Sequence, residues 1–101
     1  MNERGILQLL KTGQVQFRYP LKVYFQAGGG DFGVSVPKRN FKRAVRRNLL
    51  KRRMREAYRL NCSRLGGRKY DIFIYYVGKQ PEDYERIEKS LTQILDDLAS
   101  R

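Results

Sequence analysis

Half of the basic residues of this chain lie in one segment, residues 38–59, which holds 11 of the 22 lysines and arginines and a single acid, Glu56. The apolar residues here have helical spacing: Leu50, Met54 and Ala57 fall on one side of a helix over residues 41–61. That side, with Tyr58 at its margin, can pack on a sheet while the opposite side carries its charge in solvent. The segment therefore predicts a surface helix with one buried side.

The exposed side of this helix carries an ordered set of polar and basic residues. At about 100° per residue, four of them point within roughly 40° of one direction, and we call them the arginine ridge: Asn48, Arg52, Arg55 and Arg59. Arg46 and Arg53 flank the ridge. Arginine outnumbers lysine in the segment, which suits bidentate binding of phosphate groups.

Two interpretations of this charge are open. A run of charge is often only a solvated helix face, and such faces usually balance themselves with spaced ion pairs. Here a single acid faces 11 basic residues, so like charges three and four positions apart destabilise the free helix. We favour binding to a polyanion, whose phosphates would set register and affinity without reading sequence.

The overall composition points to the same kind of partner. The 101 residues fit one domain, and the formal net charge is +12, of which +10 belongs to residues 38–59. A nucleic acid is favoured over a membrane, because the chain has no lipidation motif and no basic helix with bulky apolar anchors. Residues 1–11 lack a signal-peptide cleavage site, no apolar run has membrane-spanning length, and Cys62 is the only cysteine. We expect a soluble cytoplasmic protein with a free thiol.

The hydrophobic patterns along the chain predict an α+β domain. Helical spacing over residues 2–11 is followed by alternating segments near residues 15–17, 21–26 and 32–36, and Gly28 to Asp31 form a turn. After the basic helix and a loop at residues 63–69, residues 70–77 are apolar on both faces, as in an interior strand. Pro81 is expected to open a last helix with an apolar stripe. The predicted order is α-β-β-β-α-β-α.

Aromatic side chains on the strands are candidates for stacking on unpaired RNA bases. Tyr24 alternates out of phase with its apolar neighbours and is the best candidate, although simple packing remains an alternative. Phe17 is a second candidate, whereas Phe32 is in phase with Val34 and is expected in the core. Three tyrosines of the interior strand are also assigned to the core: Tyr70, Tyr75 and Tyr76.

Catalytic constellations are absent from the sequence. The chain contains no histidine, so no Ser-His-Asp or Cys-His arrangement can be built. Acids gather in the last helix, where capping and solvation explain most of them, and the adjacent Asp96 and Asp97 point apart on a helix. We therefore expect no catalytic residue and no metal site in the protein itself, and these patterns argue against a stand-alone nuclease.

Residues 32–39, Phe-Gly-Val-Ser-Val-Pro-Lys-Arg, and residues 44–58, Ala-Val-Arg-Arg-Asn-Leu-Leu-Lys-Arg-Arg-Met-Arg-Glu-Ala-Tyr, resemble the signature of the bacterial ribonuclease P protein family. The resemblance implies a four-stranded sheet with a left-handed β-α-β crossover, shared with some ribosomal proteins and contrary to the usual hand. It also implies a protein subunit that binds a catalytic RNA and the 5′ leader of precursor tRNA. The RNA would hold most of the Mg²⁺ that performs hydrolysis, and no DNA would be bound.

Matching by motif extends this resemblance to individual residues. Together with the charge pattern it gives the predicted RNA-binding set: Lys38, Arg39, Lys42, Arg43, Arg46, Arg47, Asn48, Lys51, Arg52, Arg53, Arg55 and Arg59. Tyr24 and Phe17 would line the cleft for the leader, between the sheet and the first helix.

The sequence also departs from the family pattern. Leu49 stands where the family usually has a second arginine, so one phosphate contact is lost or passes to Arg46 or Arg53. Ile6 and Leu10 replace common aromatics in the first helix, and the basic N-terminal lead-in of the family is missing, which predicts weaker RNA binding. A ribosomal or ribosome-associated RNA-binding protein is the alternative. A DNA-reading helix-turn-helix fits less well, because the basic helix follows a strand.

Overall fold

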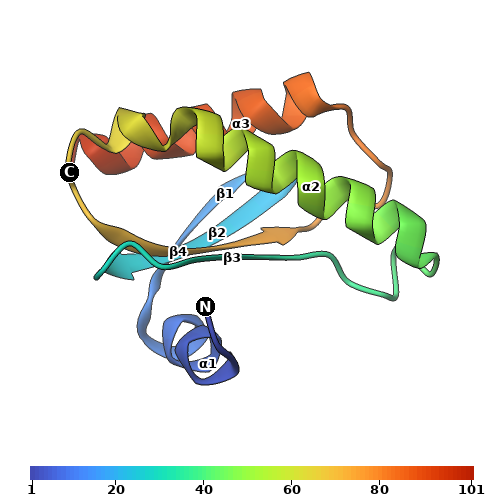
Figure 1. Cartoon of the computed structure of the whole chain (residues 1–101), viewed down its shortest axis with the longest axis horizontal. Coiled ribbons are helices and arrows are strands. Elements are labelled where there is room, and N and C mark those ends of the chain that lie inside the picture. The colour runs from blue at the N-terminus through green and yellow to red at the C-terminus, as the bar shows by residue number, and fades with distance from the viewer.

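The computed structural model describes all 101 residues, in the order of elements that the sequence predicts (Figure 1). The elements are α1 (Glu3–Thr12), β1 (Gln14–Arg18), β2 (Leu21–Ala27), β3 (Phe32–Ser35), α2 (Ala44–Asn61), the 3-10 helix η1 (Cys62–Leu65), β4 (Tyr70–Tyr76) and α3 (Tyr84–Ala99). No helix is both long enough and apolar enough to cross a membrane.

The four strands form one mixed sheet in the order β1-β2-β4-β3. β1 pairs antiparallel with β2 and β2 pairs antiparallel with β4, whereas β3 and β4 are parallel and joined through α2. In Figure 1, β3 is the near edge, α2 passes above it and β4 lies behind, which makes the crossover left-handed. This confirms the α+β class and the hand that the resemblance implies, against the strong general preference for right-handed crossovers.

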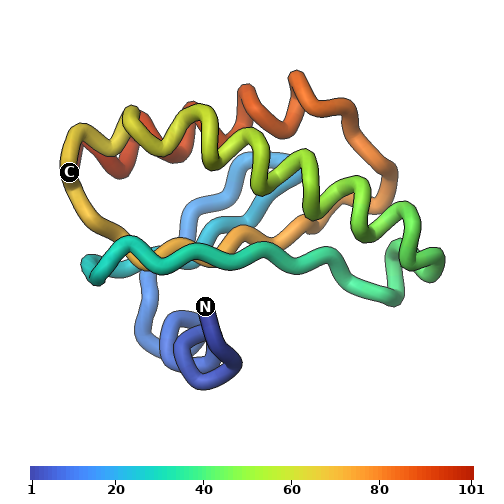
Figure 2. Tube along the Cα trace, in the orientation of Figure 1, coloured from blue at the N-terminus to red at the C-terminus, as the bar shows by residue number.

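The sheet separates two layers of helix (Figures 1 and 2). α2 and α3 cover one face, and α1 lies against the other. The core lies between the sheet and the α2–α3 layer, and Leu50, Met54 and Ala57 of α2 are fully buried in it, as their spacing predicts. Tyr58, at the margin, stacks on Phe32 of β3 with ring centroids 4.0 Å apart. The basic helix is thus fixed on the sheet by its apolar side.

Two helices begin later than the sequence predicts. α2 begins at Ala44, because Phe41 is buried in the loop before it and packs edge-on against Tyr76. α3 begins at Tyr84 instead of near Pro81, because the Asp83 carboxylate caps the helix by accepting a hydrogen bond from the backbone N–H of the third helical residue. The loop after α2 also contains a short helix, η1.

The prediction that Tyr75 lies in the core is wrong, and the apolar residues of β1 are exposed on the face of the sheet that α1 covers in part. Val15 and Phe17 are 48% and 61% exposed, because the register with β2 places them opposite Tyr24 and Lys22, on the α1 side of the sheet. Tyr75 pairs with Lys22 from β4, so it is half-buried on the same side and lies outside the core. The strand order therefore moves three aromatic rings onto the face that α1 only partly covers.

Candidate nucleic-acid interface

The loop between β3 and α2 carries exposed basic residues, and its backbone is held by hydrogen bonds and by a buried side chain. The backbone N–H groups of Asn40 and Phe41 both donate to the carbonyl oxygen of Pro37, each at 3.3 Å, and this turns the chain sharply. Lys38 and Arg39 lie on the exposed outside of this turn. Because the Phe41 ring is buried, the loop is anchored to the core and its two cations are held close to the start of α2.

Arg47 closes the same loop onto the helix. Its Nη1 donates to the carbonyl oxygens of Phe41 and Lys42, both at 2.8 Å, and its side chain is half-buried. The guanidinium has five N–H donors, so Nε and Nη2 remain available for a phosphate. Arg47 thus positions the loop and can still offer hydrogen bonds outward.

The first turn of α2 is electrostatically unfavourable in the free protein. It contains no acid, and the N-cap residue, Arg43, makes no capping hydrogen bond with its side chain. Lys42, Arg43 and Arg46 are exposed there, at the positive end of the helix macrodipole, where anions are preferred. A bound anion would relieve this repulsion.

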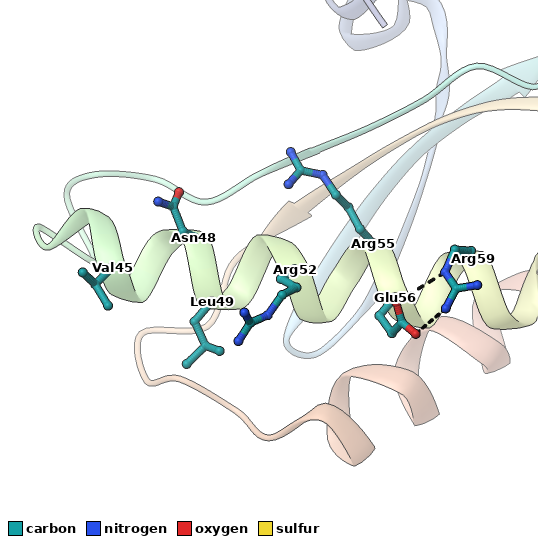
Figure 3. A pocket seen from close by; sticks show the side chains of 7 residues that line it. All are labelled: Val45, Asn48, Leu49, Arg52, Arg55, Glu56 and Arg59. Carbon is teal, nitrogen blue, oxygen red and sulfur yellow. Dashed lines mark hydrogen bonds and ion pairs between the residues drawn. The ribbon is translucent and has the colours of Figure 1, made fainter.

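The arginine ridge is formed as predicted. A shallow groove on the outward side of α2 is lined by all four of its residues together with Val45, Leu49 and Glu56 (Figure 3). Arg52 and Arg55 are exposed and take part in no ion pair. Their guanidinium groups are therefore free to bind a ligand from solvent.

One end of the ridge is partly neutralised. The Arg59 Nη2 lies 2.5 Å from Oε1 of Glu56, and its Nε donates to Oε2 at 3.4 Å, the pair drawn with dashed lines in Figure 3. This hydrogen bond to Glu56 raises the pKa of Arg59, so the guanidinium stays charged. The single acid of the basic segment therefore competes with any anion for Arg59.

Two further members of the predicted RNA-binding set are less accessible to a ligand than the exposed residues of the ridge. Arg53 is half-buried and donates from Nη1 to the carbonyl oxygen of Glu82 at 2.7 Å. Lys51 is also half-buried. The exposed members of the set are Lys38, Arg39, Lys42, Arg43, Arg46, Asn48, Arg52, Arg55 and Arg59. The structure places these along the loop, around the first turn of α2 and, for the four ridge residues, on the outward side of the helix.

Leu49 and Val45 are residues of the groove that charge-based reasoning missed. Leu49 is half-buried in the groove wall, and Val45 is 79% exposed, an unusual position for an apolar side chain on a basic helix. The Leu49 departure from the family pattern therefore places apolar surface between the cations. The helical wheel contains the signal, because positions 45, 49, 52 and 56 follow one another at helical intervals.

The two predicted cleft residues share the α1 side of the sheet. Tyr24 is half-buried, Phe17 is exposed, and they are diagonal neighbours on paired strands. Lys22 Nζ lies 5.3 Å from the centroid of the Tyr24 ring. Tyr75 of β4 pairs with Lys22 and extends this surface, which we call the aromatic face, whereas Phe73, which pairs with Tyr24, is buried. Alternation within β2 and β4 could have identified this additional residue.

Both surfaces carry side chains of the kinds that bind nucleic acid. The chain has no histidine, and its Cys, Asp and Glu side chains form no group of three or more that could hold a metal ion. Guanidinium groups and an aromatic face can instead hold phosphates and stack on bases.

Comparison with known proteins agrees with this geometry. Residues 2–99 match the family model described as Ribonuclease P. The chain is 34% identical over 93 residues to the ribonuclease P protein component of Porphyromonas gingivalis, an alignment that covers 80% of this chain and 68% of that protein. Among solved structures, the Staphylococcus aureus RNase P protein shares the fold with a TM-score of 0.80 at 24% identity, covering 96% of this chain and 91% of that one. The Thermotoga maritima RNase P protein, in complex with 1-(4-fluorophenyl)-2-thiourea, also gives 0.80, at 27% identity and 92% coverage of each chain. The chain belongs to the ribonuclease P protein family.

Proposed function

We propose that this chain, a protein component of ribonuclease P, binds the catalytic RNA of that enzyme through the arginine ridge and the loop before α2. One observation carries the proposal. Of the predicted RNA-binding set, only Arg59 forms an ion pair within the protein, although the set crowds its charges onto one helix and one loop. Such a surface lowers its free energy most by binding the phosphates of a polyanion.

The aromatic face is assigned to the substrate. The 5′ leader of a precursor tRNA is single-stranded, so its bases are free to stack on Tyr24 and Phe17, and Lys22 lies close enough to contact a phosphate. Stacking on an aromatic side chain contributes about 1–3 kcal/mol per base and tolerates different sequences. Tolerance is required, because leaders of different tRNA precursors differ.

Hydrolysis of the phosphodiester bond is assigned to Mg²⁺ ions held mainly by the RNA subunit. The protein side chains would contribute affinity and position, and none would act as acid, base or nucleophile. The donor set of the chain supports this division, since arginine and lysine bind phosphate and do not bind Mg²⁺.

Reconstitution tests the proposal. The chain is combined with a ribonuclease P RNA and a leader-bearing precursor tRNA at low Mg²⁺, and the rate of 5′ maturation is measured. We expect the protein to accelerate maturation, and the Arg52→Gln/Arg55→Gln variant to need a higher protein concentration for the same rate. No acceleration at any protein concentration would contradict the proposal. Recovery of ribosomal subunits in place of a cleaving RNA would favour a ribosomal role.

A further inference from the structure

A second group of cations lies at the opposite edge of the sheet from α2. A hollow between the end of β1 and α3 is lined by Arg18, Tyr19, Arg86, Lys89, Ser90 and Gln93. α2 packs beside β3, whereas α3 packs beside β1, and these are the two edge strands. In Figure 1, α3 and β1 lie behind α2. The hollow is therefore separate from both the arginine ridge and the aromatic face.

The polar residues of β1 that face α3 are hydrogen-bonded at the start of the strand and unpaired at its end. Gln14, Gln16 and Arg18 point to the α3 side. The first two form hydrogen bonds with the C-terminal end of the chain: Gln14 accepts from Arg101, and Gln16 donates to the carboxylate of Asp97. The side chain of Arg18, the third, has no hydrogen-bond or ion-pair partner in the protein. The strand thus ends on an exposed cation that nothing in the fold neutralises.

The α3 residues that meet Arg18 are also cations. Arg86 and Lys89 are exposed and form no ion pair, and the guanidinium carbon of Arg86 lies 5.5 Å from the centroid of the Tyr19 ring. Ser90 fixes this arrangement, because its Oγ donates to the Tyr19 carbonyl oxygen at 2.6 Å. Outside residues 38–59 the net charge is only +2, so three cations without an acid are not a consequence of a general excess.

We propose that Arg18, Arg86 and Lys89, which we call the α3 cluster, bind a phosphodiester group of RNA. The inference rests on the proposed function, because it supposes RNA already bound through α2. A cation–π contact with the Tyr19 ring restricts the Arg86 guanidinium, and its N–H groups, which donate to no acceptor in the protein, remain available for a contact with phosphate. Gln93 adds an exposed amide at the rim. Because the cluster and the ridge lie at opposite edges of the sheet, the protein can hold two separate segments of RNA together.

The test compares two double variants with the same loss of charge. Arg18→Gln/Lys89→Gln removes two members of the cluster, and Arg68→Gln/Lys69→Gln removes two exposed cations without ion pairs in the loop before β4. Salt dependence of binding is measured in two arms, protein with the RNA subunit and the reconstituted complex with precursor tRNA. We expect the cluster variant to reduce the logarithmic salt slope by about 1–2 beyond the control in one arm. That arm identifies which RNA carries the phosphate.

Equal slopes for the cluster variant and the control in both arms would overturn the inference. Should the double variant unfold at a lower temperature than the control, Lys89→Gln is compared with Lys69→Gln instead, since both side chains are exposed and form no ion pair. Variants of the ridge keep the two proposals apart. If Arg52→Gln/Arg55→Gln weakens binding and the cluster variant does not, only the α3 cluster is refuted.

Discussion

Arg53 donates a hydrogen bond from Nη1 to the carbonyl oxygen of Glu82 at 2.7 Å, which ties the middle of α2 to the loop that leads into α3. The backbone N–H of Glu82 donates in turn to Tyr76 Oη at 2.9 Å, and Tyr76 Oη donates to the Gln80 carbonyl oxygen at 2.6 Å. Arg52, the preceding residue, is exposed and has no such partner. Two adjacent arginines of the basic segment therefore serve different purposes, one in the fold and one on the surface.

Arg53→Ala should destabilise the protein, whereas Arg52→Ala should not. Loss of Arg53 leaves the Glu82 carbonyl oxygen without its charged donor, which should lower the free energy of unfolding by about 1–3 kcal/mol. Arg52→Ala should change it by no more than about 0.5 kcal/mol. Urea unfolding of the two variants measures the difference. Equal stability would contradict a structural role for Arg53.

Glu56→Gln should strengthen RNA binding. The substitution removes the carboxylate that is paired with Arg59 and frees the guanidinium for phosphate. We expect tighter binding to the RNA subunit and a logarithmic salt slope steeper by up to about 1. Glu3→Gln makes the same change of charge on α1, and serves as the control in titrations at several salt concentrations. Unchanged affinity in Glu56→Gln would show that Arg59 does not contact RNA.

Tyr24→Ala should weaken binding of the leader and leave the affinity for mature tRNA unchanged. The loss of one stacking partner should cost about 1–3 kcal/mol, which corresponds to roughly 5-fold to 150-fold in affinity. The measurement compares the reconstituted complex bound to precursor tRNA with the same complex bound to mature tRNA. An equal loss for both RNAs would place Tyr24 outside the leader site.

Alkaline pH should destabilise the protein through two tyrosines. Burial raises the pKa of Tyr76 to about 12 and that of Tyr84 to about 12, and Tyr84 Oη also donates to Glu88 at 2.9 Å. Because an unfolded tyrosine ionises near pH 10, the folded state binds more protons between pH 10 and 12. The contribution is complete below pH 10 and is lost as the pH rises through that window.

Urea unfolding between about pH 8 and pH 11 measures this loss. Tyr84→Phe should flatten the decline of stability with pH. Tyr24→Phe is the matched control, because the Tyr24 hydroxyl is not among the tyrosine hydroxyls that form hydrogen bonds within the protein. This variant should leave the decline of stability with pH unchanged. A decline of the same steepness in Tyr84→Phe and in the unsubstituted chain would contradict the assignment.

The sequence was sufficient to predict the order of elements and the orientation of α2. Its apolar residues at helical spacing select the buried side, and the ridge follows on the other side from geometry alone. The hand of the β3–α2–β4 crossover came instead from the family resemblance, because general rules favour the opposite hand.

Other features of the site depend on contacts between distant residues. Arg53 meets Glu82 across 29 positions, so no local pattern could separate it from Arg52. The strand β1 alternates between polar and apolar residues, but alternation alone does not say which face of the sheet each set lies on. In the folded sheet Gln16 is directed towards Asp97 of α3, and Phe17 is exposed beside α1. Pairing register decides such cases, and register is a property of the folded sheet.

Binding of RNA by the arginine ridge should make affinity depend on salt through the phosphate contacts of Arg52 and Arg55. Affinity for a ribonuclease P RNA is measured at several salt concentrations for the unsubstituted chain, Arg52→Gln/Arg55→Gln and the charge-matched Arg68→Gln/Lys69→Gln. We predict weaker binding and a logarithmic slope shallower by about 2 for the ridge variant, and little change for the control. Identical slopes for the ridge variant and the unsubstituted chain would show that the ridge does not contact RNA phosphates.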